Sequence, residues 1–159
     1  AAEIEALGRR AVALRADWDA PRQAEALLAQ AMQALPGLTC VVNNAALFEF
    51  DRPESFDPAL FSRHLGPNLV SPLVLARALH ARLPDDARGV VVNLLDQKLA
   101  NLNPDFFSYT LTKSALDAAT RMMARALAPK LRVVAVSPGI TLVSGDQSHD
   151  GFERAHRMT

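Results

Sequence analysis

Short apolar runs alternate with segments of helical periodicity along this chain, and that alternation restricts the fold more than any other feature. Four such runs predict β-strands, at residues 11–16, at 38–42, around 90–92 with its end at 96, and at 131–136. Strands that are continuously apolar are typical of a parallel sheet with helices on both faces. The sequence therefore predicts an α/β fold, in a single domain over residues 1–159.

The segments between these runs have the apolar period of helices. Helices are predicted from residue 21 to about 35, from about 58 to 83 with a bend near Gly66-Pro67, through the segment that holds Tyr109 and Lys113, and over a short stretch at 152–156. Residues 1–8 resemble the last turns of a helix capped by Gly8, so we expect the chain to be part of something longer.

The composition argues against several classes of function. Half of the 159 residues are apolar, which is enough for a substantial core. Seventeen basic and seventeen acidic residues cancel, with no basic stripe of the kind that binds nucleic acid. No apolar run is long enough to span a membrane, and no signal peptide is recognisable. The four histidines are scattered, so no metal site is expected. The single cysteine, Cys40, is predicted to be a buried apolar residue, which fits a cytoplasmic location.

Distinctive polar residues stand where the predicted strands end. They are Asp17, Asn43-Asn44, Asp96 and Ser137-Pro138-Gly139. One or two of them would be explained as turn residues. Ligands of parallel sheets bind beyond the carboxyl ends of the strands, so four such endings together favour a binding site at that edge.

A tyrosine and a lysine, Tyr109 and Lys113, are four residues apart on one predicted helix, so that their head groups share a face. A free phenol has a pKa of about 10 and transfers protons poorly at neutral pH until a nearby cation favours the phenolate. Lys113 can supply that cation. A solvated surface pair is the alternative interpretation of the spacing taken alone.

Taken together, these residues resemble the short-chain dehydrogenase/reductase family. The matching motifs, in the family's order, are Asn43-Asn44-Ala45-Ala46 for Asn-Asn-Ala-Gly, the helix asparagine Asn68, Tyr109-Thr110-Leu111-Thr112-Lys113, and Ser137-Pro138-Gly139. The resemblance implies a Rossmann-type doubly wound parallel sheet. It also implies that Tyr109 is the general acid/base, that Lys113 lowers its pKa and holds the nicotinamide ribose, and that Asn68 anchors a water relay. A purely structural hydrogen bond is the alternative role for Asn68.

The same resemblance implies the cofactor contacts. Asp17, with Trp18 beside it, would contact the adenine, and Asn44 and Ala45 would lie beneath the adenosine ribose, with Ala46 as a further cofactor-binding residue. The loop from Pro138 and Gly139 to Thr141 would face the nicotinamide. NADPH is the expected cofactor. NADH is not excluded, since the residues that select between them follow the family's first two strands.

Asp96 departs from the family, most of whose members have a serine there. The pteridine reductase branch is similar to this chain, because it has an aspartate thirteen residues before the tyrosine and an aromatic residue in the place of Phe48. A carboxyl group can relay a proton to a ring nitrogen, and Phe48 with Phe106 could stack on a flat heterocycle. The alternatives are core packing for Phe48 and a loop-capping role for Asp96. Ser108 lies on the helix and is not expected to replace the family's serine.

The family's Gly-rich phosphate turn, its first two strands and its last strand have no counterpart in this sequence. In the family those two strands lie between the strand that ends at Asp17 and the strand that ends at Asn44. We therefore expect a partial Rossmann-type domain whose sheet is split at this point.

The resulting hypothesis is an NADPH-dependent oxidoreductase that reduces a pterin or related heterocycle, with proton delivery by Tyr109, Lys113 and Asp96. One alternative is a short-chain reductase or dehydrogenase of carbonyl and alcohol substrates. Another is a non-catalytic scaffold on the same fold. The expected partners are a small-molecule substrate and further copies of the chain, as a dimer or tetramer.

Overall fold

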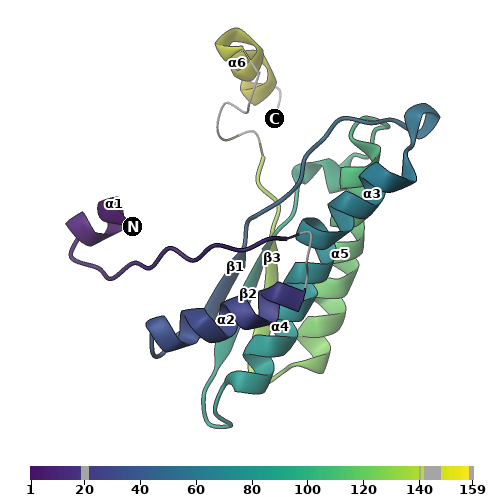
Figure 1. The fold of residues 1–159 in the computed structure, drawn as a ribbon. Helices are drawn as coiled ribbons and strands as arrows, with labels where there is room; N and C mark the ends of the chain where they lie inside the picture. The colour runs from purple at the N-terminus through teal and green to yellow at the C-terminus, as the bar shows by residue number, and fades with distance from the viewer. Residues whose placement is uncertain (19–21, 140, 142–147, 158–159) are drawn as a thin grey trace.

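The structure, a computed structural model, describes residues 1–18, 22–139, 141 and 148–157. Its centre is a parallel sheet in the order β1-β2-β3, formed by Cys40–Asn43, Gly89–Leu94 and Leu131–Val136 (Figure 1). Val41 pairs with Val91 and Val91 with Val133, so side chains in one row share a face of the sheet. The prediction of a parallel α/β sheet is confirmed.

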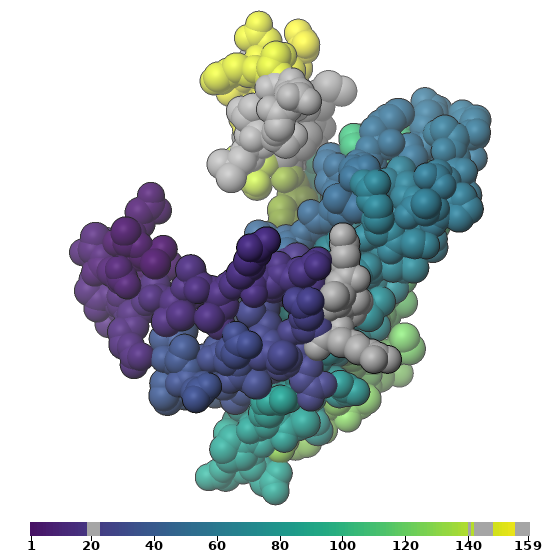
Figure 2. Space-filling model, in the orientation of Figure 1, coloured from purple at the N-terminus to yellow at the C-terminus, as the bar shows by residue number. Residues whose placement is uncertain are grey.

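Six α-helices lie in the described part of the chain: α1 Ala2–Ala6, α2 Arg22–Ala34, α3 Pro58–Leu65, α4 Ser71–Arg82, α5 Phe107–Ala126 and α6 His149–Arg157. A π-helical turn, Gly66–Val70, joins α3 to α4 where the sequence predicts a bend. Pro67 has no N–H group for the helical hydrogen bond, which accounts for the widened turn. The N-terminal segment (purple) and α6 (yellow) project from the body of the molecule (Figure 2).

The hydrophobic core lies on one face of the sheet. Helices α4 and α5 pack against the strands there, and α2 packs against α4. The buried apolar residues are Ala24, Leu28, Leu75, Ala76, Ala78, Leu79, Leu83, Val91, Leu131 and Val133. Burying these side chains contributes on the order of 1.5–3 kcal/mol for each large one, which holds α4 and α5 rigidly on the strands.

The opposite face of the sheet is open in the described part of the chain. Val42, Val134 and Val136 are exposed on it, and Cys40 is exposed as well. The prediction that Cys40 is buried is therefore wrong, and among the described residues helices cover one face of the sheet. The physical reason is that every described helix in contact with a strand lies on the other side.

The predicted strand at residues 11–16 is also absent. The segment has no regular secondary structure, and Val12 and Leu14 are exposed. An apolar run becomes a strand only where a neighbouring strand satisfies its backbone groups. Among the described strands, the sheet ends at β1, and β1 pairs only with β2.

Candidate active site

Three of the predicted catalytic residues meet beyond the carboxyl end of β2. The chain leaves β2 at Leu94 and reaches Asp96, whose Oδ1 accepts a hydrogen bond of 2.8 Å from the N–H of Lys98 and so caps a 3-10 turn. The other carboxylate oxygen of Asp96 accepts a 3.1 Å hydrogen bond from the Tyr109 hydroxyl. Asp96 therefore caps its loop, which was the structural alternative, and it also contacts the Tyr109 phenol, which the proton-relay hypothesis requires.

Lys113 completes this group from one turn further along α5. Its Nζ donates a 2.7 Å hydrogen bond to the carbonyl oxygen of Leu94 and lies 5.7 Å from the centre of the Tyr109 ring. Tyr109 and Lys113 are both buried, at 6% and 3% exposure. The solvated-pair interpretation is therefore wrong, because α5 turns this face toward the end of β2.

The protonation equilibria of the pair differ from the expectation. Burial raises the pKa of Tyr109 well above its usual value, and the Asp96 charge and hydrogen bond raise it further. Burial lowers the pKa of Lys113, although the Asp96 charge opposes that shift. The expected lowering of the Tyr109 pKa is not seen in this structure, since burial and the adjacent carboxylate raise it, and the effect of Lys113 on the phenol stays a prediction. The phenol is protonated at neutral pH and can act as a proton donor.

An aromatic surface adjoins the phenol. The ring of Phe48 stacks on Phe106 with centroids 4.0 Å apart, and it meets the Tyr109 ring edge-on at 4.7 Å. Phe50 meets Phe106 edge-on at 5.3 Å. Phe48 and Phe50 are 53% and 61% exposed, so core packing does not explain Phe48. Exposed aromatic faces next to a proton donor are suited to a flat, partly apolar ligand.

Asn68 is fully buried beneath this surface. Its side-chain oxygen accepts from the N–H of Leu47 at 2.8 Å, and its amide nitrogen donates to the carbonyl oxygen of Leu47 and to Thr112 Oγ1. These bonds fasten the chain before Phe48 to the π-helical turn that precedes α4 and to α5. The side chain has the structural role that we gave as the alternative, while the water relay stays a prediction.

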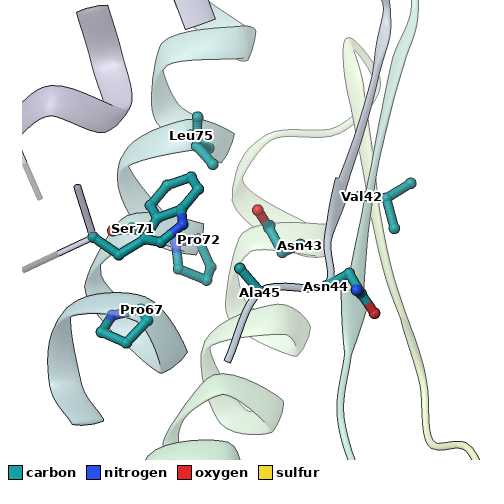
Figure 3. Close-up of a pocket in the computed structure, with 9 residues that line it drawn as sticks. Val42, Asn43, Asn44, Ala45, Pro67, Ser71, Pro72 and Leu75 are labelled. Carbon is teal, nitrogen blue, oxygen red and sulfur yellow. The ribbon is translucent and has the colours of Figure 1, made fainter. Parts of the chain in front are cut away.

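Several predicted cofactor residues surround a pair of neighbouring hollows. An open depression of about 430 Å³ is lined by Ala16, Asp17, Trp18, Ala45, Ala46, Leu47 and Pro67. A smaller cavity of about 60 Å³ lies beside it, between Trp18 and residues Val42, Asn43, Asn44, Ala45, Pro67, Ser71, Pro72 and Leu75 (Figure 3). Small-molecule sites usually enclose about 300–1,000 Å³, so the larger hollow has room for a heterocycle such as adenine.

The residues after β3 come close to the loop of Asp96. The carbonyl oxygen of Pro138 accepts a 3.2 Å hydrogen bond from the N–H of Gln97. A Cβ atom on Gly139 would lie 3.2 Å from Gln97 Oε1, so a larger residue would crowd this contact. Thr141 is exposed, and Ile140 lies outside the described residues. Their predicted contact with the nicotinamide stays a prediction.

Sequence reasoning missed Asp51, a carboxylate only 3% exposed that binds the first turn of α5. Its partner, Ser108, is 57 positions away, so no local pattern links the two. The hydroxyl of Ser108 donates to Asp51 and takes no part in the contact between Tyr109 and Asp96, as expected.

In the described part of the chain, no helix is long and apolar enough to cross a bilayer, and no group of three candidate metal ligands occurs.

The chain matches a family model described as short chain dehydrogenase over residues 1–151. A crystal structure of FolM alternative dihydrofolate reductase 1 from Brucella canis, complexed with NADP, is similar to it with a TM-score of 0.90 and 42% identity, over 96% of this chain and 60% of that one. L-xylulose reductase of Mesocricetus auratus is 33% identical over 81% of this chain and 51% of its own length. Dihydromonapterin reductase of Klebsiella pneumoniae is 25% identical over 77% and 50%. The chain thus spans 50–60% of the length of these relatives.

Proposed function

The chain belongs to the short-chain dehydrogenase family, and from this membership we propose that the whole protein reduces a C=N bond of a pterin or related heterocycle with NADPH. The observation that carries the proposal is the hydrogen bond between Tyr109 and Asp96 beside the aromatic surface of Phe48. The similar FolM structure, named as a dihydrofolate reductase and complexed with NADP, supports both the substrate class and the cofactor.

NADPH, when bound, supplies the hydride that adds to the carbon of the C=N bond. The described residues that would hold NADPH surround the two hollows, and the shape of these hollows suits the adenosine end. They are Asp17, Trp18, Asn44, Ala45 and Ala46. Lys113, already fixed by Leu94, would bind the ribose at the nicotinamide end. Pro138, Gly139 and Thr141 would border the nicotinamide.

Tyr109 and Asp96 would deliver the proton that the ring nitrogen gains. Tyr109 is protonated at neutral pH and therefore has a proton to give, although burial and Asp96, which raise its pKa, make the phenol a weaker acid than a free tyrosine. When the phenol gives its proton to the nitrogen, a proton from solvent reaches the phenolate by way of the Asp96 carboxylate. Phe48 and Phe106 would orient the heterocycle by stacking, so that carbon and nitrogen face the hydride and the phenol.

A carbonyl reductase is the second candidate, favoured by the 33% identity to L-xylulose reductase. A non-catalytic scaffold would need neither the buried ammonium of Lys113 nor the phenol beside a carboxylate. We retain homo-oligomerisation and a cytoplasmic location as parts of the proposal.

One assay separates the candidates. Purified full-length protein is incubated with NADPH and, in separate reactions, dihydrobiopterin, dihydrofolate and a panel of small ketones and sugars. Faster NADPH consumption with the pterins supports the proposal. Faster turnover of ketones or sugars contradicts it in favour of the carbonyl reductase, and no turnover favours the scaffold.

A further inference from the structure

Asp51 holds the first turn of α5 from a distant part of the chain. Its two carboxylate oxygens accept from the N–H of Ser108 at 3.0 and 3.2 Å, and the Ser108 hydroxyl donates at 2.5 Å. The backbone carbonyl of Asp51 also accepts from the N–H of Phe107 at 3.3 Å. One residue thus satisfies the first two N–H groups of the helix.

Helix α5 needs this help because its own N-cap residue gives none. Phe106 occupies the N-cap position with φ 54° and ψ 49°, in the left-handed region, and makes no side-chain capping bond. Free N–H groups at a helix start are normally satisfied by a local Ser, Thr, Asp or Asn. A carboxylate there is also favoured by the helix dipole. Asp51 replaces the local cap.

The segment that ends at Asp51 carries the aromatic surface. Alternate residues of this segment are bound to the rest of the protein. Leu47 is bound by Asn68, and Asp51 is bound to α5. Glu49 forms an ion pair with Arg63, and its N–H donates to His64 Nε2 at 3.4 Å. The residues between them, Phe48 and Phe50, are exposed. This period of two is that of an extended chain. Fixing Asp51 therefore fixes where the two rings stand.

Tyr109 directly follows Ser108, so the same contact sets the position of the phenol. We propose that Asp51 is a positioning residue, which locks the Phe48 segment and the first turn of α5 together and so holds the aromatic surface and the Tyr109 hydroxyl in register. This inference rests on the proposed function. The contact is buried, and neither Asp51 nor Ser108 lines the hollows at Asp17 and Trp18, so we expect its loss to affect turnover more than cofactor binding.

The test compares four variants of the full-length protein, assayed with NADPH and the substrate class that the wild type reduces. Asp51→Ala removes the carboxylate, Asp51→Asn keeps an acceptor for the Ser108 N–H, and Ser108→Ala removes the hydroxyl bond alone. The control is Asp57→Ala, because Asp57 caps α3 with a 2.9 Å bond from Ala59 but is exposed.

We expect Asp51→Ala to lower kcat by about 10- to 100-fold, since small displacements of reacting groups have effects of this size. The Kd for NADPH should change by less than about twofold, and Asp51→Asn should restore most of kcat because its amide oxygen can cap the helix. Asp57→Ala also removes a helix cap, from α3, and should keep its kcat.

A folded Asp51→Ala variant with the kcat of the wild type would overturn the inference, and so would an equal kcat loss in Asp57→Ala. If Asp51→Ala does not fold, Ser108→Ala decides: a lower kcat at unchanged NADPH affinity supports the inference, and an unchanged kcat refutes it. Tyr109→Phe, assayed in parallel, separates the two proposals. If that variant loses activity while Asp51→Ala keeps it, only the role of Asp51 is refuted.

Discussion

The hydroxyl of Tyr109 donates a 3.1 Å hydrogen bond to a carboxylate oxygen of Asp96. Each group is fixed by its surroundings. The carboxylate of Asp96 accepts from the N–H of Lys98, and Tyr109 lies on the buried face of α5. A phenol that donates to a carboxylate keeps its proton more tightly than one in water. The contact keeps the phenol in the protonated state that reduction of a C=N bond needs, although it also makes the phenol a weaker acid.

Replacing Asp96 by Asn should lower the pKa of Tyr109 toward its ordinary value, because the carboxylate charge and its hydrogen bond both raise that pKa. Tyr109 is the only tyrosine of this chain. The measurement is a pH titration followed by the ultraviolet absorbance of tyrosinate. The contribution of Tyr109 is the part of this signal that is absent from the Tyr109→Phe variant. In the wild type this signal should be absent up to a pH of about 10, and in Asp96→Asn it should appear at lower pH than in the wild type. If the tyrosinate signal of the wild type appeared at the same pH as that of Asp96→Asn, or at a lower pH, Asp96 would not be what keeps the proton on Tyr109.

Asp96→Ser should change which substrates the protein prefers. A serine hydroxyl can assist at a carbonyl oxygen, whereas it relays a proton to a ring nitrogen less well than a carboxyl group. The ratio of kcat/KM for dihydrobiopterin to that for a small ketone should fall by about tenfold or more. An unchanged ratio would mean that Asp96 plays no part in selecting the substrate.

Phe48→Ala should weaken binding of the heterocycle more than binding of the cofactor. Aromatic pairs contribute about 0.5–1.5 kcal/mol beyond the burial of area, which corresponds to a rise in KM for dihydrobiopterin of roughly 2- to 13-fold. Met122→Ala is a suitable control, since Met122 is 65% exposed on α5, the helix of Tyr109, beyond the buried residues that carry the site. Equal effects of the two substitutions on KM would argue against stacking on Phe48.

Asn93→Ala should destabilise the fold that supports the site. Asn43 Nδ2 donates to Asn93 Oδ1 at 2.7 Å, and Asn93 Nδ2 donates to Thr120 Oγ1 at 2.8 Å, so this buried chain ties β1 and β2 to α5. Its loss leaves buried polar groups unpaired, at a cost of about 1–3 kcal/mol each. Urea unfolding should show a decrease of this size in the free energy of unfolding. The exposed ion pair of Arg121 with Asp117 gives the control, because Arg121→Ala should cost less than about 0.5 kcal/mol.

The regular elements with local signals could be predicted from the sequence. The strand at 131–136 has the same bounds in the structure, because an apolar run there is followed by Pro138 and has β2 beside it. The equally apolar run at 11–16 is no strand, since strand formation depends on a neighbour that a local pattern does not reveal. Family membership and the resemblance to pteridine reductases, inferred from the Asn43 and Tyr109 motifs and from Asp96, are confirmed by the comparisons.

The site could be predicted only where residues lie close in sequence or belong to a motif. Tyr109 and Lys113 are one turn apart, and Asp96 is singled out through the resemblance to the pteridine reductase branch. The contact between Asp51 and Ser108 escaped prediction because it joins segments 57 residues apart. The direction of the pKa shift of Tyr109 escaped it as well, since burial, the largest cause of that shift, is a property of the packed structure.

The most direct test of the account is the kcat of Tyr109→Phe in the full-length protein, with dihydrobiopterin as substrate and NADPH binding measured separately. Removal of one hydroxyl leaves the stacking surface and the cofactor contacts in place. We predict that NADPH affinity is retained within about twofold while kcat falls by at least about 100-fold, as expected for a lost general acid. A variant that binds NADPH and still turns over dihydrobiopterin at the rate of the wild type would contradict the account.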